Sequence, residues 1–354
     1  MSYVINRDEL VRFCTEACEK FGYSHEDAAM TAEVLAETDM MGTHSHGTKN
    51  LLGYMKKTEA GGIKANANVA VVRQGPAWAL LEGDNAIGMV PSYRAMEMAI
   101  EKAKVTGIAM VNVRNSTHYG AAGYYAVMAA RKGMIGISMS NTDPNMAIPG
   151  GKGREIGNSP FSIAFPQKCG DPLFLDIAMS ATAALKVLKA MKAGESIPDT
   201  WVVDENGFPS TNPGDFLTGG AAQPMAAHKG YGLAMAIEIL TGILGGGAIL
   251  HEIPSWNYDM ATPNRVSHCF MAIDISQFID PADFGDRLEE YTDAIHNSPK
   301  RSDSRGILVP GEIECGRYAK AKANGLNLPD DVAETLLELS ELCGLPVDMR
   351  KIEE

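Results

Sequence analysis

Short apolar runs alternate with helix-like segments through most of the chain after residue 76. The runs that we predict as strands are 77–83, 108–115, 134–141, 161–166, 172–180 and 268–278. Segments between them, such as 90–107 and 120–133, place apolar residues at helical spacing and end in glycine. This alternation predicts an α/β fold, in which helices cover a central sheet.

The first 60 residues have a different pattern, which is typical of a helical unit. The helices that we predict here are 7–20, 25–41 and 50–60. Asn6 and Ser24 precede the first two in positions where their side chains cap the helix. Two later segments also indicate helices: 330–344 is amphipathic, and 226–247 is bounded by glycines and almost entirely apolar. We expect the helix at 226–247 to be buried, because it lacks a polar face.

The composition excludes several classes of protein. The 354 residues carry a formal net charge of −13 with 21% charged residues spread along the chain, which argues against a nucleic-acid partner. The N-terminal segment is charged throughout, unlike a signal peptide, and no apolar run reaches the roughly 18 residues of a membrane span. Six cysteines lack paired spacing. We therefore expect reduced cysteines and a cytoplasmic protein that does not bind membranes.

Two glycine-flanked turns carry candidate catalytic histidines. The first turn is GTHSHGTKN, residues 42–50. His44 and His46 could bind a metal here, with Asp39 as the nearest acidic residue. Alternatively, one of the two histidines could be a general acid or base that Ser45 orients. The turn could also simply cap the preceding helix. In RNSTHYG, residues 114–120, His118 follows an apolar strand, where α/β proteins place ligand-binding groups.

Glycine-rich segments supply candidate anion sites. Lys229 and Gly230 stand just before the apolar helix, so an ammonium group and free backbone N–H groups converge at a helix N-terminus, as in phosphate sites. The run GGKGREIG at 150–157 resembles a dinucleotide fingerprint, but a long loop precedes it and a strand follows it. A Rossmann motif needs a strand before and a helix after, so this fold is disfavoured.

Five segments, in this order and at these separations, resemble one known family. They are SHG at 45–47, NSTHYGAAGYY at 115–125, GGKGREIGNSP at 150–160, HKGYGLAMAIEIL at 228–240 and VPGE at 309–312. The sequence resembles the type 2 malate/L-lactate dehydrogenases, a family that also includes L-sulfolactate, ureidoglycolate and 2,3-diketogulonate dehydrogenases and cyclic-imine reductases. The resemblance extends from about residue 5 to residue 345.

The resemblance implies an α+β fold and a homodimer that uses NAD or NADP. It implies a non-Rossmann cofactor domain over 76–304, built on a mixed, largely antiparallel sheet. Segments 1–75 and 305–354 would together form a helical domain for substrate and dimer contacts. By the same resemblance, His46 and His118 lie near the reacting carbon. The expected cofactor contacts are Thr142, Asp176, Ile177, Ala178, Met179, Ser180, His228, Lys229, Gly230, Gly311 and Glu312.

The substrate expected from the resemblance is a small anion. Many relatives have SHGxxR, whose arginine can bind a carboxylate; here that position is Asn50, beside Lys49, so the usual 2-oxo acid preference is open. We expect Lys49, Asn50 and Tyr54 to contact the substrate. A second difference is NSP at 158–160, where relatives commonly have TNP.

These residues predict an oxidoreductase that moves a hydride between NAD(P) and C2 of a 2-hydroxy or 2-oxo acid of the malate, lactate, sulfolactate or ureidoglycolate type. We favour His118 as the proton carrier, with His46 and Ser45 polarising the carbonyl or orienting the substrate. Three alternatives stay open at this point. They are a reductase of a cyclic 2-imino acid, a metal-dependent hydrolase or lyase using His44 and His46, and a nicotinamide-binding protein without catalytic activity.

Overall fold

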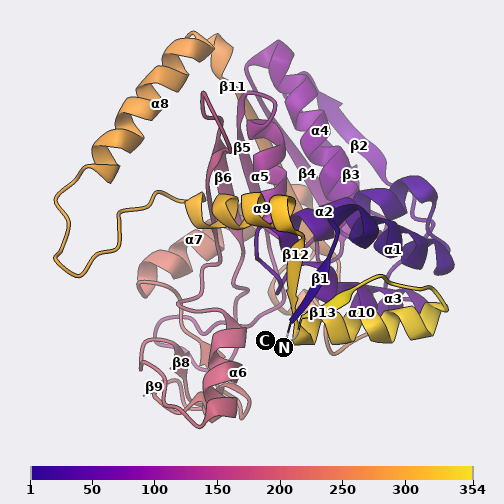
Figure 1. The fold of residues 1–354 in the computed structure, drawn as a ribbon. Helices are drawn as coiled ribbons and strands as arrows, with labels where there is room; N and C mark the ends of the chain where they lie inside the picture. The colour runs from indigo at the N-terminus through magenta and orange to yellow at the C-terminus, as the bar shows by residue number, and fades with distance from the viewer. Residues whose placement is uncertain (1, 353–354) are drawn as a thin grey trace.

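A seven-stranded sheet forms the centre of the computed structural model, which describes residues 2–352 (Figure 1). In spatial order its strands are β2 (Ala70–Gly75), β3 (Trp78–Glu82), β4 (Ile108–Ser116), β11 (Val266–Asp274), β5 (Met134–Ser140), β6 (Phe161–Phe165) and β7 (Leu173–Ile177). Only β3 and β4 pair in parallel; every other neighbouring pair is antiparallel. The expected mixed, largely antiparallel sheet is confirmed.

Two different hydrophobic cores pack against this sheet, one on each of its sides. On β11, Phe270 and Ala272 belong to the core under α4 (Met89–Thr106) and α5 (Ala122–Ala130), whereas Cys269 and Met271 pack in the core on the opposite face. Successive side chains of a strand point to opposite faces. Burial on both faces therefore explains why the central strands are continuous apolar runs.

Residues from both ends of the sequence form a helical unit beside the sheet. Strand β1 (Ser2–Ile5) lies between β12 (Leu326–Pro329) and β13 (Arg350–Ile352), antiparallel to both. The helices of this unit are α1 (Arg7–Lys20), α2 (His25–Met40), α3 (Leu51–Glu59), α9 (Glu312–Asn324) and α10 (Asp330–Cys343). Its core is continuous with the α4 side of the sheet. The division into domains at residues 75 and 305 stays a prediction.

The predicted helix starts are confirmed in this unit. The Asn6 side chain accepts a hydrogen bond of 2.8 Å from the backbone N–H of Asp8, and the Ser24 hydroxyl accepts one from Asp27. These side chains satisfy N–H groups that have no partner inside the helix. Sequence patterning did not predict β2, β12 or β13.

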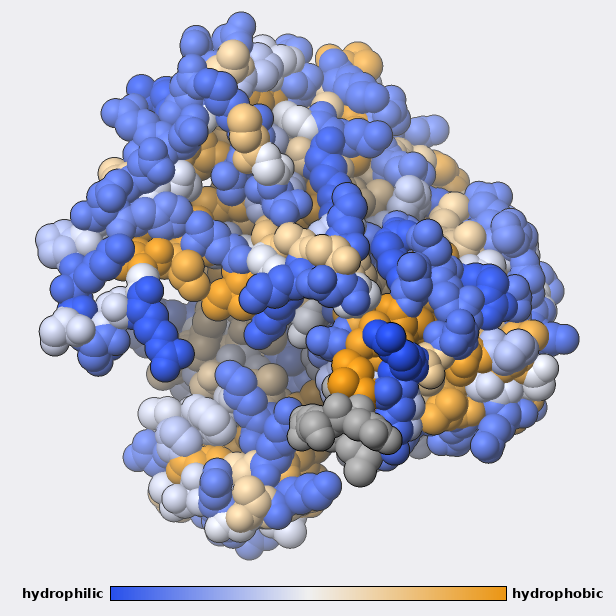
Figure 2. All heavy atoms as spheres, in the orientation of Figure 1, coloured by the Kyte–Doolittle hydropathy of each residue, from blue (hydrophilic) through white to orange (hydrophobic). Residues whose placement is uncertain are grey.

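A small unit and a projecting helix complete the chain. Helix α6 (Ala184–Ala193) joins the short strands β8 (Val202–Val203), β9 (Pro209–Ser210) and β10 (Ala221–Ala222) below the sheet, and α8 (Pro281–His296) extends away from the body (Figure 1). Figure 2 shows a hollow between the small unit and the loop that follows α8. No helix within residues 2–352 combines the length and apolar character needed to span a bilayer.

The expected burial of the apolar helix is wrong. Its residues form α7 (His228–Glu238) followed by a π-helical turn, η3 (Ile239–Ile243), which contacts β11 and β4 on one side only. Large apolar side chains remain exposed on the other side, namely Leu233, Met235, Ile239, Leu240, Ile243 and Leu244. The helix lacks a polar face, yet the described chain covers only part of its surface.

Candidate active site

The turn at 42–50 is organised by one buried carboxylate. Asp39, at the end of α2, accepts hydrogen bonds from the backbone N–H of Thr48 at 2.8 Å and from its hydroxyl at 2.5 Å, and it pairs with Nδ1 of His44 at 2.8 Å. Gly47 packs directly against this carboxylate, because a Cβ there would lie 2.2 Å from Oδ1. Only glycine therefore allows the turn to close around Asp39.

This turn presents Ser45 and His46 toward the sheet. The Ser45 hydroxyl lies 2.8 Å from Nδ1 of His46, and the side-chain amide of Asn50 donates to the Ser45 carbonyl oxygen at 2.9 Å. Asn50 thus holds the turn from within. Lys49 lies 2.5 Å from Oδ2 of Asp331 on α10. The substrate roles of Lys49 and Asn50 stay predictions.

The structure brings the two histidine turns together. His118 follows the end of β4, and its ring lies 5.6 Å from that of His46, centroid to centroid, with an interplanar angle of 25°. The Tyr54 hydroxyl, from α3, lies 2.6 Å from Nδ1 of His118. The indole of Trp256 stacks on the His118 imidazole at 4.5 Å and 18°. Residues far apart in sequence therefore surround one imidazole and leave its Nε2 atom for a ligand.

Both imidazoles are held in their neutral forms. Burial, and then the nearby His46 and His268, keep the pKa of His118 well below its ordinary value. Burial also lowers the pKa of His46. His46 nevertheless keeps an exposed surface and His118 is only partly covered. Both rings are therefore neutral near pH 7 and reachable from solvent.

Several of the expected cofactor contacts lie in one continuous strip. We define this strip as Thr142, Asn158, Met179, Met225 and Gly230, which contact one another in this order. The Thr142 hydroxyl lies 3.2 Å from Oδ1 of Asn158, whose carbonyl oxygen accepts from the N–H of Met179 at 2.7 Å. The Met179 carbonyl in turn accepts from Met225 at 2.8 Å. A Cβ at Gly230 would lie within 2.8 Å of both the Met225 and Met179 carbonyl oxygens. Thr142, Met179 and Gly230 thus lie side by side.

This strip contains features that fit a dinucleotide. Ser180 bridges to Pro224 at its edge. Two buried polar atoms of the neighbouring loops, Oδ1 of Asn145 and Oγ1 of Thr182, have no hydrogen-bond partner within the described protein. Buried polar atoms are normally paired, so these two atoms indicate a place where a ligand or water completes the hydrogen bonding.

The start of α7 adds positive potential to the strip. Ala226 and Ala227 precede the helix with φ of 46° and 53°, a strained region for alanine that turns the chain sharply. His228 and Lys229 follow and are both exposed. The N–H groups of Lys229, Gly230 and Tyr231 already donate to carbonyl oxygens of residues 225–227. The positive end of the helix dipole and the Lys229 ammonium therefore give this end its positive potential.

Asp176 lies on the edge strand β7, at the N-terminus of the helix that follows His118. Its carboxylate accepts a hydrogen bond of 2.8 Å from the N–H of Gly123 in α5. Asp176 keeps an exposed surface, but the protein around its carboxylate desolvates it and raises its pKa to about 6. The Gly123 bond opposes this rise, and Glu314 adds to it. Ile177 and Ala178 continue the chain from Asp176 to the strip, so segment 176–180 connects the N-terminus of α5 to the cofactor candidates.

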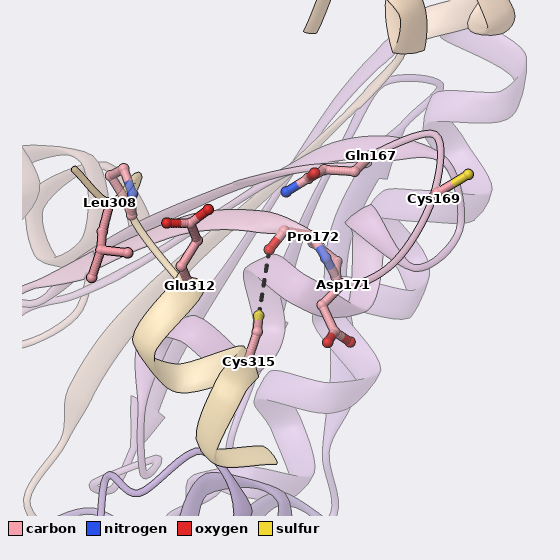
Figure 3. Close-up of a pocket in the computed structure, with 8 residues that line it drawn as sticks. Gln167, Cys169, Asp171, Pro172, Leu308, Glu312 and Cys315 are labelled. Carbon is pink, nitrogen blue, oxygen red and sulfur yellow. Dashed lines mark hydrogen bonds between the residues drawn. The ribbon is translucent and has the colours of Figure 1, made fainter. Parts of the chain in front are cut away.

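Gly311 and Glu312 lie at the other end of β7. Gly311 packs against the Phe174 ring, and Glu312 lies 2.8 Å from Nε2 of His296 while accepting from the N–H of Val309. A cavity of about 390 Å³ opens here, lined by Gln167, Asp171, Leu308, Glu312 and Cys315 among others. Figure 3 shows Glu312 facing this cavity and Cys169 turned away from Cys315. The cavity lies at the start of β7, away from His118.

Residues 5–337 match the profile of a protein family described as malate/L-lactate dehydrogenase. The chain belongs to this family. It is 40% identical over 315 residues to the malate dehydrogenase of Pyrococcus abyssi, covering 87% of this chain and 86% of that protein. The structure of the malate dehydrogenase from Pyrococcus horikoshii superposes with a TM-score of 0.89 at 34% identity, covering 98% of this chain and 97% of that one.

The sulfolactate dehydrogenase of Methanocaldococcus jannaschii is a third similar structure, with a TM-score of 0.90, 34% identity and 98% coverage of both chains. The malate/L-lactate dehydrogenase resemblance predicted from the sequence is confirmed, and the chain is a dehydrogenase. The catalytic and binding roles of individual residues stay predictions.

The two histidines of the metal-dependent alternative make other contacts in the structure. Within residues 2–352, no group of three or more histidine, cysteine and acidic side chains is arranged to hold a metal ion. His44 is bound by Asp39, whereas His46 bonds to Ser45 and stacks on His118. The two histidines of the turn thus have separate partners.

Two neighbours of His118, the aromatic Trp256 and the titratable His268, were not predicted from the sequence. Trp256 lies in a loop more than 130 residues away in the sequence, with no motif around it. His268 lies inside β11, where its ring nitrogens lie 2.8 Å from the Ser140 hydroxyl and 2.9 Å from the Ser116 hydroxyl. A polar residue within an apolar strand is the signal that could have identified His268.

Proposed function

We propose that this dehydrogenase transfers a hydride between a nicotinamide dinucleotide and C2 of a small 2-hydroxy or 2-oxo acid. The observation that carries the proposal is the stacking of the His46 ring on the His118 ring. Membership of the malate/L-lactate dehydrogenase family supports the reaction class. When bound, the nicotinamide supplies or accepts the hydride.

His118 is proposed as the group that moves the proton. An alcohol does not lose its proton unaided near neutral pH, so oxidation needs a base at the hydroxyl oxygen. The lowered pKa of His118 keeps its imidazole unprotonated and ready to accept. Nδ1 is bonded to Tyr54, which leaves Nε2 for the substrate oxygen. A ring that accepts a proton at Nε2 carries a hydrogen on Nδ1 in both of its protonation states, so in this role Nδ1–H donates to the Tyr54 oxygen throughout.

His46 and Ser45 are proposed to orient the substrate. The bond from Ser45 to Nδ1 of His46 fixes that ring beside His118 and leaves its Nε2 for the substrate carbonyl or carboxylate. Asn50 replaces the arginine that many family members have, and the charge of Lys49 is paired with Asp331. An acid with a polar group other than a simple carboxylate at this position therefore suits the site.

The dinucleotide is proposed to bind along the strip from Thr142 to Gly230. The unpaired atoms of Asn145 and Thr182 offer hydrogen-bonding partners, and the α7 N-terminus with Lys229 offers an anion site for phosphate. NAD and NADP differ by one ribose phosphate. Thermal-shift titration with each cofactor distinguishes them, since the preferred cofactor stabilises the protein at the lower concentration.

A homodimer is proposed through the exposed apolar side of α7 and η3. Ile243 is 56% exposed and Leu244 is 61% exposed, far more than such side chains show in a protein interior. Leu244→Asp should shift the sedimentation coefficient of a dimer to that of a monomer. A wild-type protein that sediments as a monomer at micromolar concentration would contradict the dimer.

Single-turnover hydride transfer tests the catalytic proposal. His118→Gln and His46→Gln are mixed with reduced cofactor and a panel of 2-oxo acids, sulfonated 2-oxo acids and cyclic imines, and the nicotinamide absorbance is followed. We expect His118→Gln to lower the rate by about 10²–10⁴ and to remove the fall in rate with rising pH, because His118 must donate a proton in the direction of reduction. Normal rates and profiles in both variants would refute the proton-transfer role. Turnover of imines alone would identify the reductase alternative.

A further inference from the structure

The loop at 254–262 covers one face of the His118 ring. It carries Trp256, whose indole lies 4.5 Å from the His118 ring and 5.7 Å from the Tyr54 ring, centroid to centroid. The near-parallel stacking on His118 places a large apolar surface on one face of the imidazole. Trp256 is also packed against the main hydrophobic core, so it is supported from behind.

A buried lysine fastens this loop to the body. The Lys57 ammonium donates hydrogen bonds to the backbone carbonyl oxygens of Asp259 and of Thr262, the latter at 2.9 Å. Only 1% of Lys57 is exposed, and burial lowers its pKa although Asp259 opposes this. Burying an ammonium group is costly unless its hydrogens are bonded. The Lys57 ammonium therefore stabilises the loop through these hydrogen bonds and does not add charge to the protein surface.

Helix α3 supports the imidazole and the loop at the same time. Tyr54 and Lys57 are three residues apart on this helix, so their side chains share one side. Tyr54 bonds to Nδ1 of His118, and Lys57 holds the loop that covers the same ring. Further contacts shape the loop: Asn264 donates to the Pro254 carbonyl oxygen, and a Cβ at Gly62 would lie 2.3 Å from the Met260 carbonyl oxygen.

We propose that Trp256 is a positioning residue for His118 and that the buried Lys57 ammonium clamps it in place. Stacking restricts the imidazole to one plane, and the Tyr54 bond then fixes its rotation within that plane. The indole also keeps water from one face of the ring. With the clamp closed, Nε2 stays aimed at the substrate oxygen and the imidazole stays neutral.

The titratable groups facing His118 come from three elements. They are Tyr54 on α3, His46 in the turn after α2, and His268 on β11. The Trp256 loop adds no charge to the ring itself. Removal of the indole therefore changes the solvation and the freedom of His118, and leaves its three titratable neighbours in place.

Ring-selective NMR tests the placement without requiring activity. In protein labelled at its eight histidines, the His118 signals are assigned by their loss in His118→Gln. A stacked indole shifts the His118 ring protons upfield. We expect this shift to disappear in Trp256→Leu and in Lys57→Met, and the His118 pKa to rise toward its ordinary value in both. The matched controls Trp78→Leu and Lys56→Met alter an exposed tryptophan and an exposed lysine, and should leave the signals unchanged.

Steady-state kinetics test the functional part, which rests on the proposed function. Trp256→Leu and Lys57→Met should lower kcat about tenfold to a hundredfold, as expected for a misplaced catalytic group. The cofactor KM should stay within about twofold, and Trp256→Phe should restore most of kcat because it keeps a stacked ring.

Three results would overturn the inference. One is an unchanged His118 spectrum in Trp256→Leu and Lys57→Met. Another is a lost upfield shift together with wild-type kcat and pH profile, which would leave the loop with a packing role only. If the shift depends on both residues but no substrate of the panel is turned over, the proposed function fails and the positioning role falls with it, while the stacking itself stands.

Discussion

His268 makes the stability of this protein depend on pH in a way that can be measured. Its side chain is fully buried in the middle of the sheet and joins three strands through Ser116 on β4 and Ser140 on β5. Burial lowers its pKa from 6.5 to about 3. Below pH 6.5 the unfolded chain therefore binds a proton that the folded chain does not. Stability from this group is complete above pH 6.5 and is lost progressively as the pH falls toward 3.

The size of the loss follows from the two pKa values. Between about pH 8 and pH 4.5, linkage gives a contribution of about 3 kcal/mol to the free energy of unfolding. His268→Gln removes this titration. The variant should be less stable than wild type near pH 8, because its hydrogen bonds to the two serines are altered, but it should lose about 3 kcal/mol less on acidification.

Urea unfolding at fixed protein concentration, near pH 8 and near pH 4.5, measures both quantities. The other titratable groups are common to wild type and variant, so the difference in pH dependence isolates His268. The control is His251→Gln at an exposed histidine, which should leave the pH dependence unchanged. Equal acid-induced losses in wild type and His268→Gln would refute the assignment of a neutral, buried imidazole.

Three further predictions concern His118, the turn at 42–50 and the start of α7. Tyr54→Phe removes the hydroxyl that bonds to His118 and should lower kcat about tenfold in steady-state assays, since such a bond contributes about 1–2 kcal/mol. Gly47→Ala places a Cβ against the Asp39 carboxylate and should reduce the free energy of unfolding by about 1–3 kcal/mol, as measured in urea. Lys229→Ala should raise the cofactor KM and leave the substrate KM nearly unchanged, because an ammonium group at the α7 N-terminus is lost.

Each of these predictions has a result that contradicts it. A Tyr54→Phe enzyme with wild-type kcat would mean that the phenol does not act on His118. For Gly47→Ala the control is Gly53→Ala on α3, where a Cβ meets open space; equal effects of the two changes would exclude the Asp39 contact as the cause. A raised substrate KM with normal cofactor KM in Lys229→Ala would move the lysine to the substrate side.

Helices and strands were predicted well from the local sequence where a single preference, such as helix capping or burial of both strand faces, determines the element. The caps at Asn6 and Ser24 fixed two helix starts, and continuous apolar runs identified the strands with two buried faces. Strand β2, by contrast, lies at the sheet edge and is largely exposed, so it lacks an apolar pattern. Edge strands are bonded by their backbone, which leaves little trace in the side chains.

The arrangement of the candidate site was predictable only in part. The family resemblance predicted that His46 and His118 lie close together, because the family motifs place both histidines near the reacting carbon. Trp256 and Lys57 could not be found in this way, since the contact between them and His118 depends on where a loop folds back. The exposure of α7 was not predicted either. An apolar pattern predicts that the surface of a helix is covered, but it does not identify what covers that surface.

Strand β1 has a consequence for how the molecule is made. Its partners are residues 326–329 and 350–352, so β1 gains its neighbours only after more than 300 further residues have been synthesised. Helices α1 and α2 can form early from local contacts, whereas their sheet needs residues 326–352. Such long sequence separation slows folding. The two ends of the described chain also lie side by side (Figure 1), so a short peptide joining them, with new ends opened in a surface loop, should yield a permuted protein with the same architecture.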